Sequence, residues 1–198
     1  MPPLAFALLD ARSGRLLEER QAEVRAWPGS TVKPFVPAIG RFPCRRQLRI
    51  GAHQFPCRHP PAYGPLDRMD AVMLSCNCFF AAAALAIPPG RLQRALWEFD
   101  ARLAATNEQR QLQALGHWGV SASPLSLARA YRRLALADSE AEPLAPGFSG
   151  KTGTTAGAAW YAGWFPPEAP RLVIAVLTSG RGATDARPAA EEILARWR

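Results

Sequence analysis

Two short apolar runs near the N-terminus predict a β-hairpin. They occupy residues 4–9 and 16–19, and residues 10–14 between them contain the aspartate and glycine that suit a tight turn. The dipeptide Pro28-Gly29 ends the strand pattern, and Ser30 follows as the N-terminus of a helix. We therefore expect two strands and then the start of a helix.

The centre of the chain has the periodicity of helices. Apolar residues recur at helical spacing over residues 66–87, and Ser75-Cys76-Asn77 interrupts them, which predicts two helices joined at that point. Residues 91–103 and 125–137 are amphipathic and rich in leucine, alanine and arginine. Residues 40–65 carry many prolines, glycines and arginines with little periodicity, so we expect an irregular connection there.

The last part of the chain changes from helical to strand character. Glycine and threonine are frequent in residues 150–154, aromatic residues in 158–165 and β-branched residues in 171–178. This pattern predicts three strands joined by short turns. Residues 189–197 read as a helix whose glutamates lie early and whose arginine lies late, matching the helix dipole. The expected order is two strands, a helical insert, three strands and a helix.

Length and composition favour one folded domain. A chain of 198 residues with 48% hydrophobic residues can bury one sizeable core. The longest apolar stretches, residues 81–87 and 172–177, are far shorter than the roughly 20 residues that cross a bilayer. The N-terminal residues lack the basic start and small-residue cleavage site of a secretory signal. We therefore expect neither a membrane span nor a signal peptide in this chain.

The formal net charge of +8 raises the question of an anionic partner. The basic residues are scattered, and no stripe of basic and aromatic residues is visible, so we expect a solvated basic surface and no nucleic acid. Of the 24 basic residues, only Lys33 and Lys151 are lysines. Because lysine can lose its proton and arginine effectively cannot, these two positions are the first candidates for chemistry.

Ser30 and Lys33 lie one helical turn apart, which places a hydroxyl and an amine on the same face of a helix. A desolvated lysine near another cation can be neutral and can accept the serine proton, so the pair can generate a nucleophile without a histidine. The spacing is also frequent by chance, and by itself it fits a helix cap followed by an exposed lysine. The neighbouring motifs must decide between these readings.

Three motifs follow one another along the chain: Ser30-x-x-Lys33, Ser75-x-Asn77 and Lys151-Thr152-Gly153. In this order they resemble the three motifs of the penicillin-binding proteins and serine β-lactamases. The resemblance covers nearly the whole chain, through residues 28–34, 75–80, 120–131 and 160–178. Within that family the chain is most similar to the elongation-type class B transpeptidases, through residues 42–44, 55–57 and 63–67.

The resemblance implies an α+β fold of the α/β sandwich type. A five-stranded antiparallel sheet, built from N- and C-terminal elements, would pack against an inserted helical subdomain. The sheet lobe would comprise residues 1–27 and 148–198 and the helical lobe residues 28–147, within a single compact transpeptidase-like domain. Ser75 follows Ser30 by 45 positions and Lys151 follows Ser75 by 76, both short for the family, so we expect a shortened catalytic domain without a pedestal or anchor.

The resemblance also implies catalytic roles. Ser30 would attack the carbonyl of a terminal D-Ala-D-Ala peptide and form an acyl-enzyme, with Lys33 as the base. Ser75 would relay a proton to the departing amine, and Asn77 would hold the amide of the donor peptide. The amine of a second peptide would then resolve the acyl-enzyme, and β-lactams would acylate the same serine.

The third motif would bind substrate. Lys151 and Thr152 would bind the substrate carboxylate, and Gly153 would let the substrate backbone approach the strand edge. The backbone N–H groups of Ser30 and Thr154 would form the oxyanion hole, in which a single donor is typically worth about 3 kcal/mol. Thr154 would also reach the carboxylate.

Four cysteines and two histidines lie close together in sequence: Cys44, Cys57, Cys76, Cys78, His53 and His59. Such a cluster suggests either zinc or a disulfide. The resemblance implies a zinc ion beside the active site, held by Cys44, Cys57 and Cys76. The position of the expected histidine carries Tyr63, so His59 is the nearest substitute. The alternative is a disulfide between Cys44 and Cys57, with the other two thiols buried as small apolar groups. The acyl-transfer chemistry itself requires no cofactor.

The implied function is a peptidoglycan D,D-transpeptidase on the extracytoplasmic side of the cell envelope. Its partners would be the peptidoglycan stem peptide, β-lactam antibiotics and proteins of cell-wall synthesis. One alternative is a D,D-carboxypeptidase or weak β-lactamase, in which water resolves the acyl-enzyme. Nothing here resembles the extra carboxylate with which many β-lactamases activate water, so we expect slow turnover of β-lactams. A further alternative is a non-catalytic scaffold with the same fold.

Overall fold

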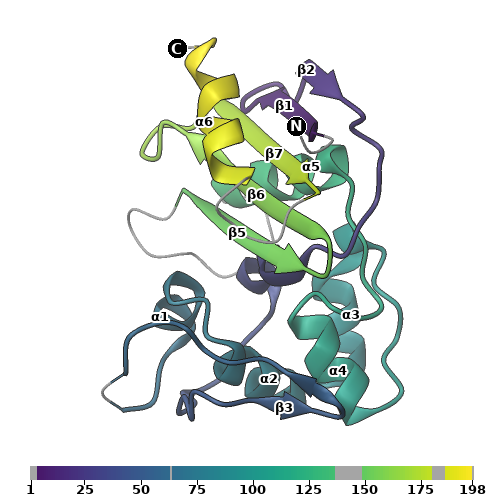
Figure 1. Ribbon diagram of the computed structural model, residues 1–198, viewed down its shortest axis with the longest axis vertical. Helices are drawn as coiled ribbons and strands as arrows, with labels where there is room; N and C mark the ends of the chain where they lie inside the picture. The colour runs from purple at the N-terminus through teal and green to yellow at the C-terminus, as the bar shows by residue number, and fades with distance from the viewer. Residues whose placement is uncertain (1–3, 63, 137–148, 180–185, 198) are drawn as a thin grey trace. The chain divides into compact units, whose positions relative to one another are not determined.

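The computed structural model of the protein describes residues 4–62, 64–136, 149–179 and 186–197 (Figure 1). These residues divide into two compact units. The sheet unit contains residues 4–31, 121–136, 149–179 and 186–197, and the helical unit contains residues 32–62 and 64–120. The 3-10 helix η1, Gly29–Phe35, leads from the first unit into the second.

A five-stranded antiparallel sheet forms the centre of the sheet unit. Its strands are β1 (Leu4–Asp10), β2 (Leu16–Arg20), β5 (Gly150–Thr155), β6 (Ala158–Phe165) and β7 (Leu172–Thr178). Their order across the sheet is β2-β1-β7-β6-β5, so β1 pairs both with its hairpin partner and with the last strand of the chain. The N- and C-terminal strands therefore form one sheet, which confirms the predicted α+β fold class.

Two helices cover the sheet. Because successive side chains of a strand point to opposite faces, each face can bury its own helix. Val176 of β7 lies in one buried cluster with Ile193 and Leu194 of helix α6 (Ala186–Ala195). Helix α5 (Pro124–Ala135) contacts β1, β6 and β7, and Figure 1 shows it on the face opposite α6. The unit thus has three layers with apolar packing on both sides of the sheet.

Helix α5 differs from the expected division of the chain. The sequence placed residues 28–147 in the helical lobe, whereas α5 belongs to the sheet unit. Its apolar stripe provides the reason, since Leu127, Ala128 and Tyr131 are fully buried in a helix that contacts three strands. A capping box at Ser123 fixes where the helix begins. An amphipathic helix packs where its stripe is covered, and chain order does not specify that place. That the two units form a single domain stays a prediction.

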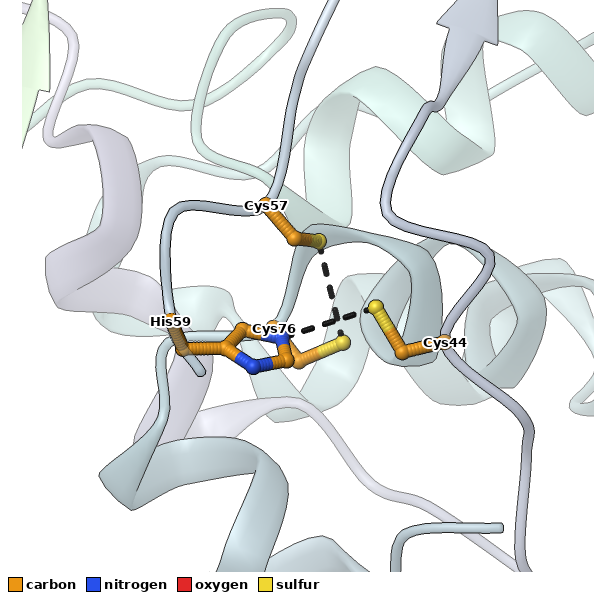
Figure 2. A group of neighbouring side chains, drawn as sticks. All are labelled: Cys44, Cys57, His59 and Cys76. Atoms are coloured by element: carbon orange, nitrogen blue, oxygen red, sulfur yellow. Dashed lines mark hydrogen bonds between the residues drawn. The ribbon is translucent and has the colours of Figure 1, made fainter. Parts of the chain in front are cut away.

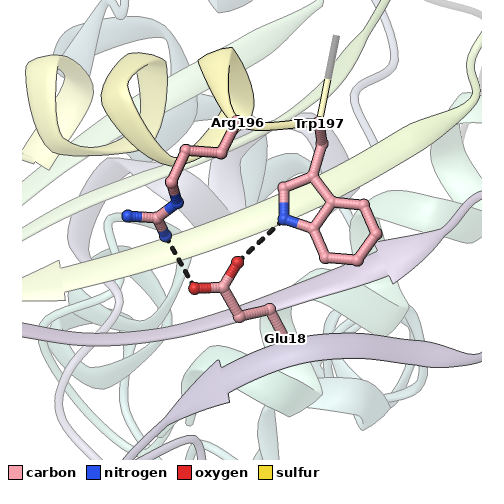
Figure 3. A network of polar contacts seen from close by, with 3 residues as sticks. All are labelled: Glu18, Arg196 and Trp197. Carbon is pink, nitrogen blue, oxygen red and sulfur yellow. Dashed lines mark hydrogen bonds and ion pairs between the residues drawn. The ribbon is translucent and has the colours of Figure 1, made fainter.

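The C-terminal end of α6 is tied to the edge strand β2 (Figure 3). One carboxylate oxygen of Glu18 accepts a hydrogen bond from Arg196 at 2.6 Å, and the other accepts one from the indole N–H of Trp197 at 2.8 Å. Because Arg196 is half exposed, this ion pair contributes little to stability. It fixes the register of the helix end against the strand.

The helical unit contains short helices around an apolar core. Its helices are α1 (Arg68–Met73), α2 (Asn77–Ala86), α3 (Pro89–Ala95), the 3-10 helix η2 (Trp97–Phe99) and α4 (Asn107–Ala114). Phe79, Phe80 and Phe99 are fully buried, and α4 contacts both α2 and α3. The break between α1 and α2 confirms the predicted pair of helices joined at Ser75. Within the described residues, no helix is long and apolar enough to cross a bilayer.

Three segments differ from the sequence-based expectation. The helix predicted over residues 91–103 ends at Ala95, and the chain then turns through η2 to Asp100, whose backbone is left-handed with φ 48°. Helix α4 was not predicted, because its sequence is almost entirely polar. Residues 40–65 contain a two-stranded hairpin of β3 (Arg49–Ile50) and β4 (His53–Gln54) within an otherwise irregular connection.

Candidate active site

Close backbone packing holds the segment around Ser30 against β5 in the sheet unit. A methyl group placed on Gly153 would overlap the carbonyl oxygen of Pro28. One placed on Gly29 would lie 2.9 Å from the carbonyl oxygen of Thr154, and Gly29 also has a left-handed φ of +54°. Only glycine permits both approaches. The structure therefore brings Ser30, itself half-buried, beside the third motif.

Two hydrogen bonds hold the residues on either side of Ser30. The buried indole N–H of Trp160 in β6 donates to the carbonyl oxygen of Trp27 at 2.9 Å. The hydroxyl of Tyr131 in α5 donates to the carbonyl oxygen of Thr31, also at 2.9 Å. Burial raises the pKa of Tyr131, so this phenol stays a neutral donor. Strand and helix together therefore fix the backbone that presents the serine.

Helix η1 carries both Ser30 and Lys33. The sequence predicted a helix here, and the structure has a 3-10 helix with Pro34 inside it. Because a 3-10 helix has three residues per turn, side chains at positions i and i+3 lie on the same side of it. The hydroxyl and the amine therefore leave η1 in the same direction.

In the helical unit, Lys33 joins the first motif to the second. Its Nζ lies 2.6 Å from Oδ1 of Asn77, 2.8 Å from the carbonyl oxygen of Ser75 and 3.2 Å from Oγ of Ser75. The ring of Phe80 lies 5.6 Å from the same nitrogen, within range of a cation–π interaction. The side chain is fully buried. This lysine is thus held in place by polar groups and is not a solvated surface charge.

The side chain of Asn77 has a fixed orientation. While its oxygen faces Lys33, its amide nitrogen donates to the carbonyl oxygens of Phe55 and Pro56 at 3.4 and 3.3 Å. The neighbouring Ser75 lies in the tight turn between α1 and α2 with a left-handed φ of 53°, an uncommon conformation for a residue with a side chain. The second motif therefore depends on both a strained turn and a loop that precedes Cys57.

The bonds of Lys33 bear on how it could exchange a proton. An ammonium group has three N–H donors and no acceptor, and the three oxygens around Nζ match that form. A neutral amine keeps two donors and gains a lone pair, so one partner must then donate. Of these three partners, the hydroxyl of Ser75 can do so, whereas the other two are a carbonyl and an amide oxygen. His117 lies in the same unit, and burial together with the charge of Lys33 lowers the pKa of His117 to about 4, which leaves it neutral.

Lys151 lies on β5, the last strand of the sheet order. It is 8% exposed, and burial lowers the pKa of Lys151 to about 8. Its Nζ donates to the carbonyl oxygen of Thr152 at 3.4 Å. Thr152 is half-buried and Thr154 is exposed. Below pH 8 this edge strand therefore combines a buried positive charge with two hydroxyl groups, a set that can bind a carboxylate.

A second cluster in the helical unit brings together Cys44, Cys57, His59 and Cys76 (Figure 2). One side-chain atom from each lies within 4.8 Å of the others. The four come from two loop segments and from the turn before α2, and their sulfur and nitrogen atoms point toward one another in Figure 2. Sequence analysis named these four residues as metal candidates, and the structure places them together. Tyr63 lies outside the described residues.

The geometry of this cluster suits a tetrahedral zinc ion. Bonds of about 2.3 Å to sulfur and about 2.0–2.1 Å to nitrogen require sulfurs roughly 3.8 Å apart and a sulfur and a nitrogen roughly 3.6 Å apart. The sulfurs of Cys57 and Cys76 lie 3.8 Å apart, and Sγ of Cys44 lies 3.5 Å from Nε2 of His59. Nδ1 of His59 faces the carbonyl oxygen of Pro60 at 2.7 Å, so it carries the proton and leaves Nε2 free to ligate.

The four cysteines are free thiols, and the sulfurs of Cys76 and Cys78 lie within hydrogen-bond distance of that of Cys57. The hydrogen bond between Cys57 and Cys76 lowers the pKa of Cys57 and raises that of Cys76. The pair therefore loses a first proton readily and a second with difficulty. Burial raises the pKa of Cys78, whose sulfur lies 3.7 Å from that of Cys57. A thiolate is the form that binds metal, so the cluster already favours one ligand in its binding form.

Solved structures with the same fold were found by comparison. Penicillin-binding protein PBP2 from Helicobacter pylori matches 88% of this chain and 55% of its own, with a TM-score of 0.70 and 16% identity. PBP2 from Pseudomonas aeruginosa in complex with WCK 5153 matches 99% of this chain and 74% of its own, with a TM-score of 0.77 and 14% identity. The fold is that of the penicillin-binding proteins. A third structure, the complex between PBP2 and MreC from H. pylori, matches 90% of this chain and 56% of its own, with a TM-score of 0.69 and 16% identity.

This chain spans little more than half of the H. pylori penicillin-binding protein. No family model and no curated protein matches its sequence. The comparison therefore shows the penicillin-binding fold, while the chemistry of the site rests on the contacts described above.

Several contacts of this candidate site were not visible in the sequence. The carbonyl oxygens that hold Asn77 belong to Phe55 and Pro56, and a backbone acceptor leaves no trace in residue type. The ring of His117 packs edge-on against Phe55 with ring centres 5.0 Å apart. The only sequence signal for His117 is that histidine is rare in this chain, which has three.

Proposed function

We propose that this chain is a serine D,D-transpeptidase that forms an acyl-enzyme on Ser30 from D-Ala-D-Ala peptides and is acylated by β-lactams. The observation that carries the proposal is the set of hydrogen bonds from Lys33 to Ser75 and Asn77. These bonds join two motifs that lie more than 40 positions apart, and Lys33 shares helix η1 with Ser30. Burial of Lys33 beside the turn at Ser75 costs desolvation energy, and a non-catalytic scaffold would gain nothing from it.

In the first step, Oγ of Ser30 attacks the carbonyl carbon of the penultimate D-alanine while Lys33 takes the serine proton. The N–H groups of Ser30 and Thr154 stabilise the oxyanion. The C–N bond then breaks, and the terminal D-alanine leaves with a proton that Ser75 relays from Lys33 to its amine. An amine of a second stem peptide attacks the acyl-enzyme, returns its proton through the same groups and restores Ser30.

The terminal carboxylate would be bound by Lys151 together with the hydroxyl groups of Thr152 and Thr154. The protonated lysine would supply the positive charge, and the two hydroxyl groups would donate directed hydrogen bonds to the carboxylate. The amide of Asn77 would hold the donor peptide. The substrate backbone would align along the edge of β5, where Gly153 has no side chain to obstruct it.

Labelling with a fluorescent penicillin tests the acylation step. We expect a stable adduct on the wild type and none on Ser30→Ala or Lys33→Arg, because a permanent cation cannot accept a proton. Ser13→Ala is the matched control, since Ser13 lies in the exposed turn of the first hairpin and should leave labelling unchanged. If the folded wild type formed no adduct, the non-catalytic scaffold would be the remaining interpretation.

A second assay separates transpeptidase from carboxypeptidase. Incubation with a pentapeptide stem and an amine acceptor should release D-alanine and yield a cross-linked product of matching amount. Release of D-alanine without that product would instead identify water as the acceptor and the chain as a D,D-carboxypeptidase.

We further propose that Cys44, Cys57, His59 and Cys76 bind one zinc ion, because their spacing fits tetrahedral coordination. The ion would act as a structural cross-link between the loops and the turn before α2. Metal analysis of protein purified without added zinc should give one zinc per chain, and His59→Ala should lose it. Absence of metal, with a mass lower by two hydrogens, would support a disulfide instead.

We also propose a place and a partner. Stem peptides lie outside the cytoplasmic membrane, so the chain would act on that side of the cell envelope. The solved complex of PBP2 with MreC suggests a cell-wall synthesis protein as a partner. Comigration of this chain with the MreC of its own genome in gel filtration would support this, and separate elution at micromolar concentrations would oppose it.

A further inference from the structure

Cys78 is a buried thiol that the proposed zinc site does not use. Four ligands complete a tetrahedral site, and Cys44, Cys57, His59 and Cys76 already supply them. Cys78 is 8% exposed and lies in the first turn of α2. Its sulfur is nevertheless 3.7 Å from that of Cys57, as close as Cys76 is to Cys57. A fourth sulfur beside a complete set of four ligands calls for an explanation.

The two cysteines of this close pair belong to the two segments that position Asn77. Cys78 follows Asn77 directly in α2. Cys57 follows Phe55 and Pro56, whose carbonyl oxygens accept the hydrogen bonds from the Asn77 amide. Those bonds measure 3.4 and 3.3 Å, near the long end of the range, so a small shift of the loop would break them. A covalent link between these segments would therefore act directly on Asn77.

We propose that Cys57 and Cys78 are a modification site, where a reversible disulfide forms when no metal is bound and slows acylation of Ser30. This inference rests on the proposed function for its effect on acylation, and on the sulfur geometry alone for the bond. While zinc is bound, Cys57 is a ligand and is protected, so metal and disulfide exclude each other. The pair would make acylation depend on both zinc supply and thiol oxidation.

The bond forms by exchange with a small-molecule disulfide. The thiolate of Cys57 attacks one sulfur of the small disulfide, which gives a mixed disulfide and releases one small thiolate. The thiolate of Cys78 then attacks the sulfur of Cys57 and releases the second. The protein loses two protons and two electrons, and the small disulfide becomes two thiols. A reducing thiol reverses both steps.

The choice of Cys78 over Cys76 follows from the backbone. A disulfide requires sulfurs about 2.0 Å apart, so the pair must approach by roughly 1.7 Å. Cys76 follows the strained turn at Ser75 and its N–H is bonded to the carbonyl oxygen of Ala71, so it has little freedom. Cys78 lies in a regular helix, and Cys57 lies in a loop whose N–H at Cys57 donates to the carbonyl oxygen of Arg46. Closing the bond requires the loop to shift at that hydrogen bond, and the shift moves the acceptors of Asn77 with it.

The experiment uses the full chain in zinc-loaded and chelator-treated forms, each exposed to oxidised glutathione. In the chelator-treated form we expect a mass lower by two hydrogens and a peptide link between Cys57 and Cys78, while the zinc-loaded form stays reduced. The linked protein should react with fluorescent penicillin at least about tenfold more slowly, since displacements near 1 Å at an active site are that costly. Dithiothreitol should restore the rate.

Cys78→Ala is the decisive variant, because it removes the extra thiol and keeps all four zinc ligands. It should bind one zinc and form no link, and in its chelator-treated form the oxidant should leave only the mixed disulfide at Cys57, which Cys78 is no longer there to displace. In the wild type, a link from Cys57 to Cys76, a mixed disulfide that persists, or a link without change in labelling would overturn the inference. Reduced protein that forms the link but never reacts with penicillin would instead overturn the proposed function and leave the modification site intact.

Discussion

Nζ of Lys33 and Oδ1 of Asn77 lie 2.6 Å apart, a short contact between the first and second motifs. This bond turns the amide so that its nitrogen faces the loop at Phe55 and Pro56. Among the three oxygens bonded to Lys33, the hydroxyl of Ser75 is the one that can both accept and donate. Proton exchange between the lysine and Ser75 therefore requires no rearrangement of Asn77.

Asn77→Asp should suppress acylation by charge alone. A carboxylate 2.6 Å from the amine would hold the protonated form, which cannot take the proton of Ser30. A neighbouring opposite charge shifts a pKa by about 1–3 units, so we expect a rate about 10- to 1,000-fold lower at pH 7. The second-order rate with fluorescent penicillin against pH measures this, and its rising limb should move to higher pH.

The exposed Asn107→Asp in the first turn of α4 is the control, because it makes the same chemical change far from Lys33 in sequence. It should leave the pH profile in place. An Asn77→Asp profile that overlays the wild type would show that Lys33 does not act as the base.

The pKa of Lys151, lowered to about 8 by burial, sets a second pH dependence. Burial disfavours the charged form, so the side chain is positive below pH 8 and loses its charge above it. A substrate carboxylate should therefore bind less well as the pH rises through about 8. Acylation by benzylpenicillin should fall above this pH in the wild type. The acylation rate of Lys151→Arg should not change as the pH rises through about 8, because arginine stays charged. A fall of the same size in Lys151→Arg would assign it to another group.

The sequence predicted the parts of this fold whose signal is local. The strands β6 and β7 are marked by aromatic and β-branched runs, and the break at Ser75 by an interruption of helical spacing. The pairing of β1 with β7 joins segments more than 160 residues apart, and only the family resemblance implied it. Helix α4 was missed because only Leu112 interrupts its polar run before Ala114, so no apolar period exists to detect.

The same distinction holds within the candidate site. Side-chain motifs revealed Lys33 and Asn77, because their chemistry depends on residue type. The backbone oxygens of Phe55 and Pro56 depend on where a loop passes, which residue type does not encode. Likewise the sequence listed the cysteines of the cluster, but only their three-dimensional arrangement places Cys78 beside Cys57.

Gly153→Ala should separate β5 from the segment that carries Ser30. The added methyl group would overlap the carbonyl oxygen of Pro28 and lie 2.9 Å from the side chain of Thr31. Overpacking of this kind costs about 1–3 kcal/mol of unfolding free energy, measurable by urea denaturation. Labelling by fluorescent penicillin should fall about tenfold or more, because the shift would move Ser30 away from the N–H of Thr154, the second oxyanion donor of the proposed mechanism.

Gly90→Ala in α3 is the matched control, since its nearest neighbour is the flexible end of Arg94 at 3.5 Å. Alanine is the better helix former by about 1 kcal/mol, so this variant should be as stable as the wild type or more so. Equal stability of Gly153→Ala and the wild type would show that the strand and the serine segment are not in close contact.

Replacement of Ser75 by alanine and by glycine separates its hydroxyl from its backbone. Both variants lose the hydroxyl that is bonded to Lys33, so both should label with penicillin equally slowly. They differ in stability, because the backbone at this position is left-handed with φ 53° and only glycine adopts that conformation without a side-chain clash. The left-handed penalty of about 1–2 kcal/mol exceeds the entropic cost of glycine, about 0.5–1 kcal/mol. Urea denaturation should therefore find Ser75→Gly more stable than Ser75→Ala by about 0.5–1 kcal/mol. If Ser75→Ala were the more stable variant, the left-handed backbone of this turn would have relaxed on loss of the hydroxyl. The hydrogen bond to Lys33 would then be what holds the turn in its left-handed conformation.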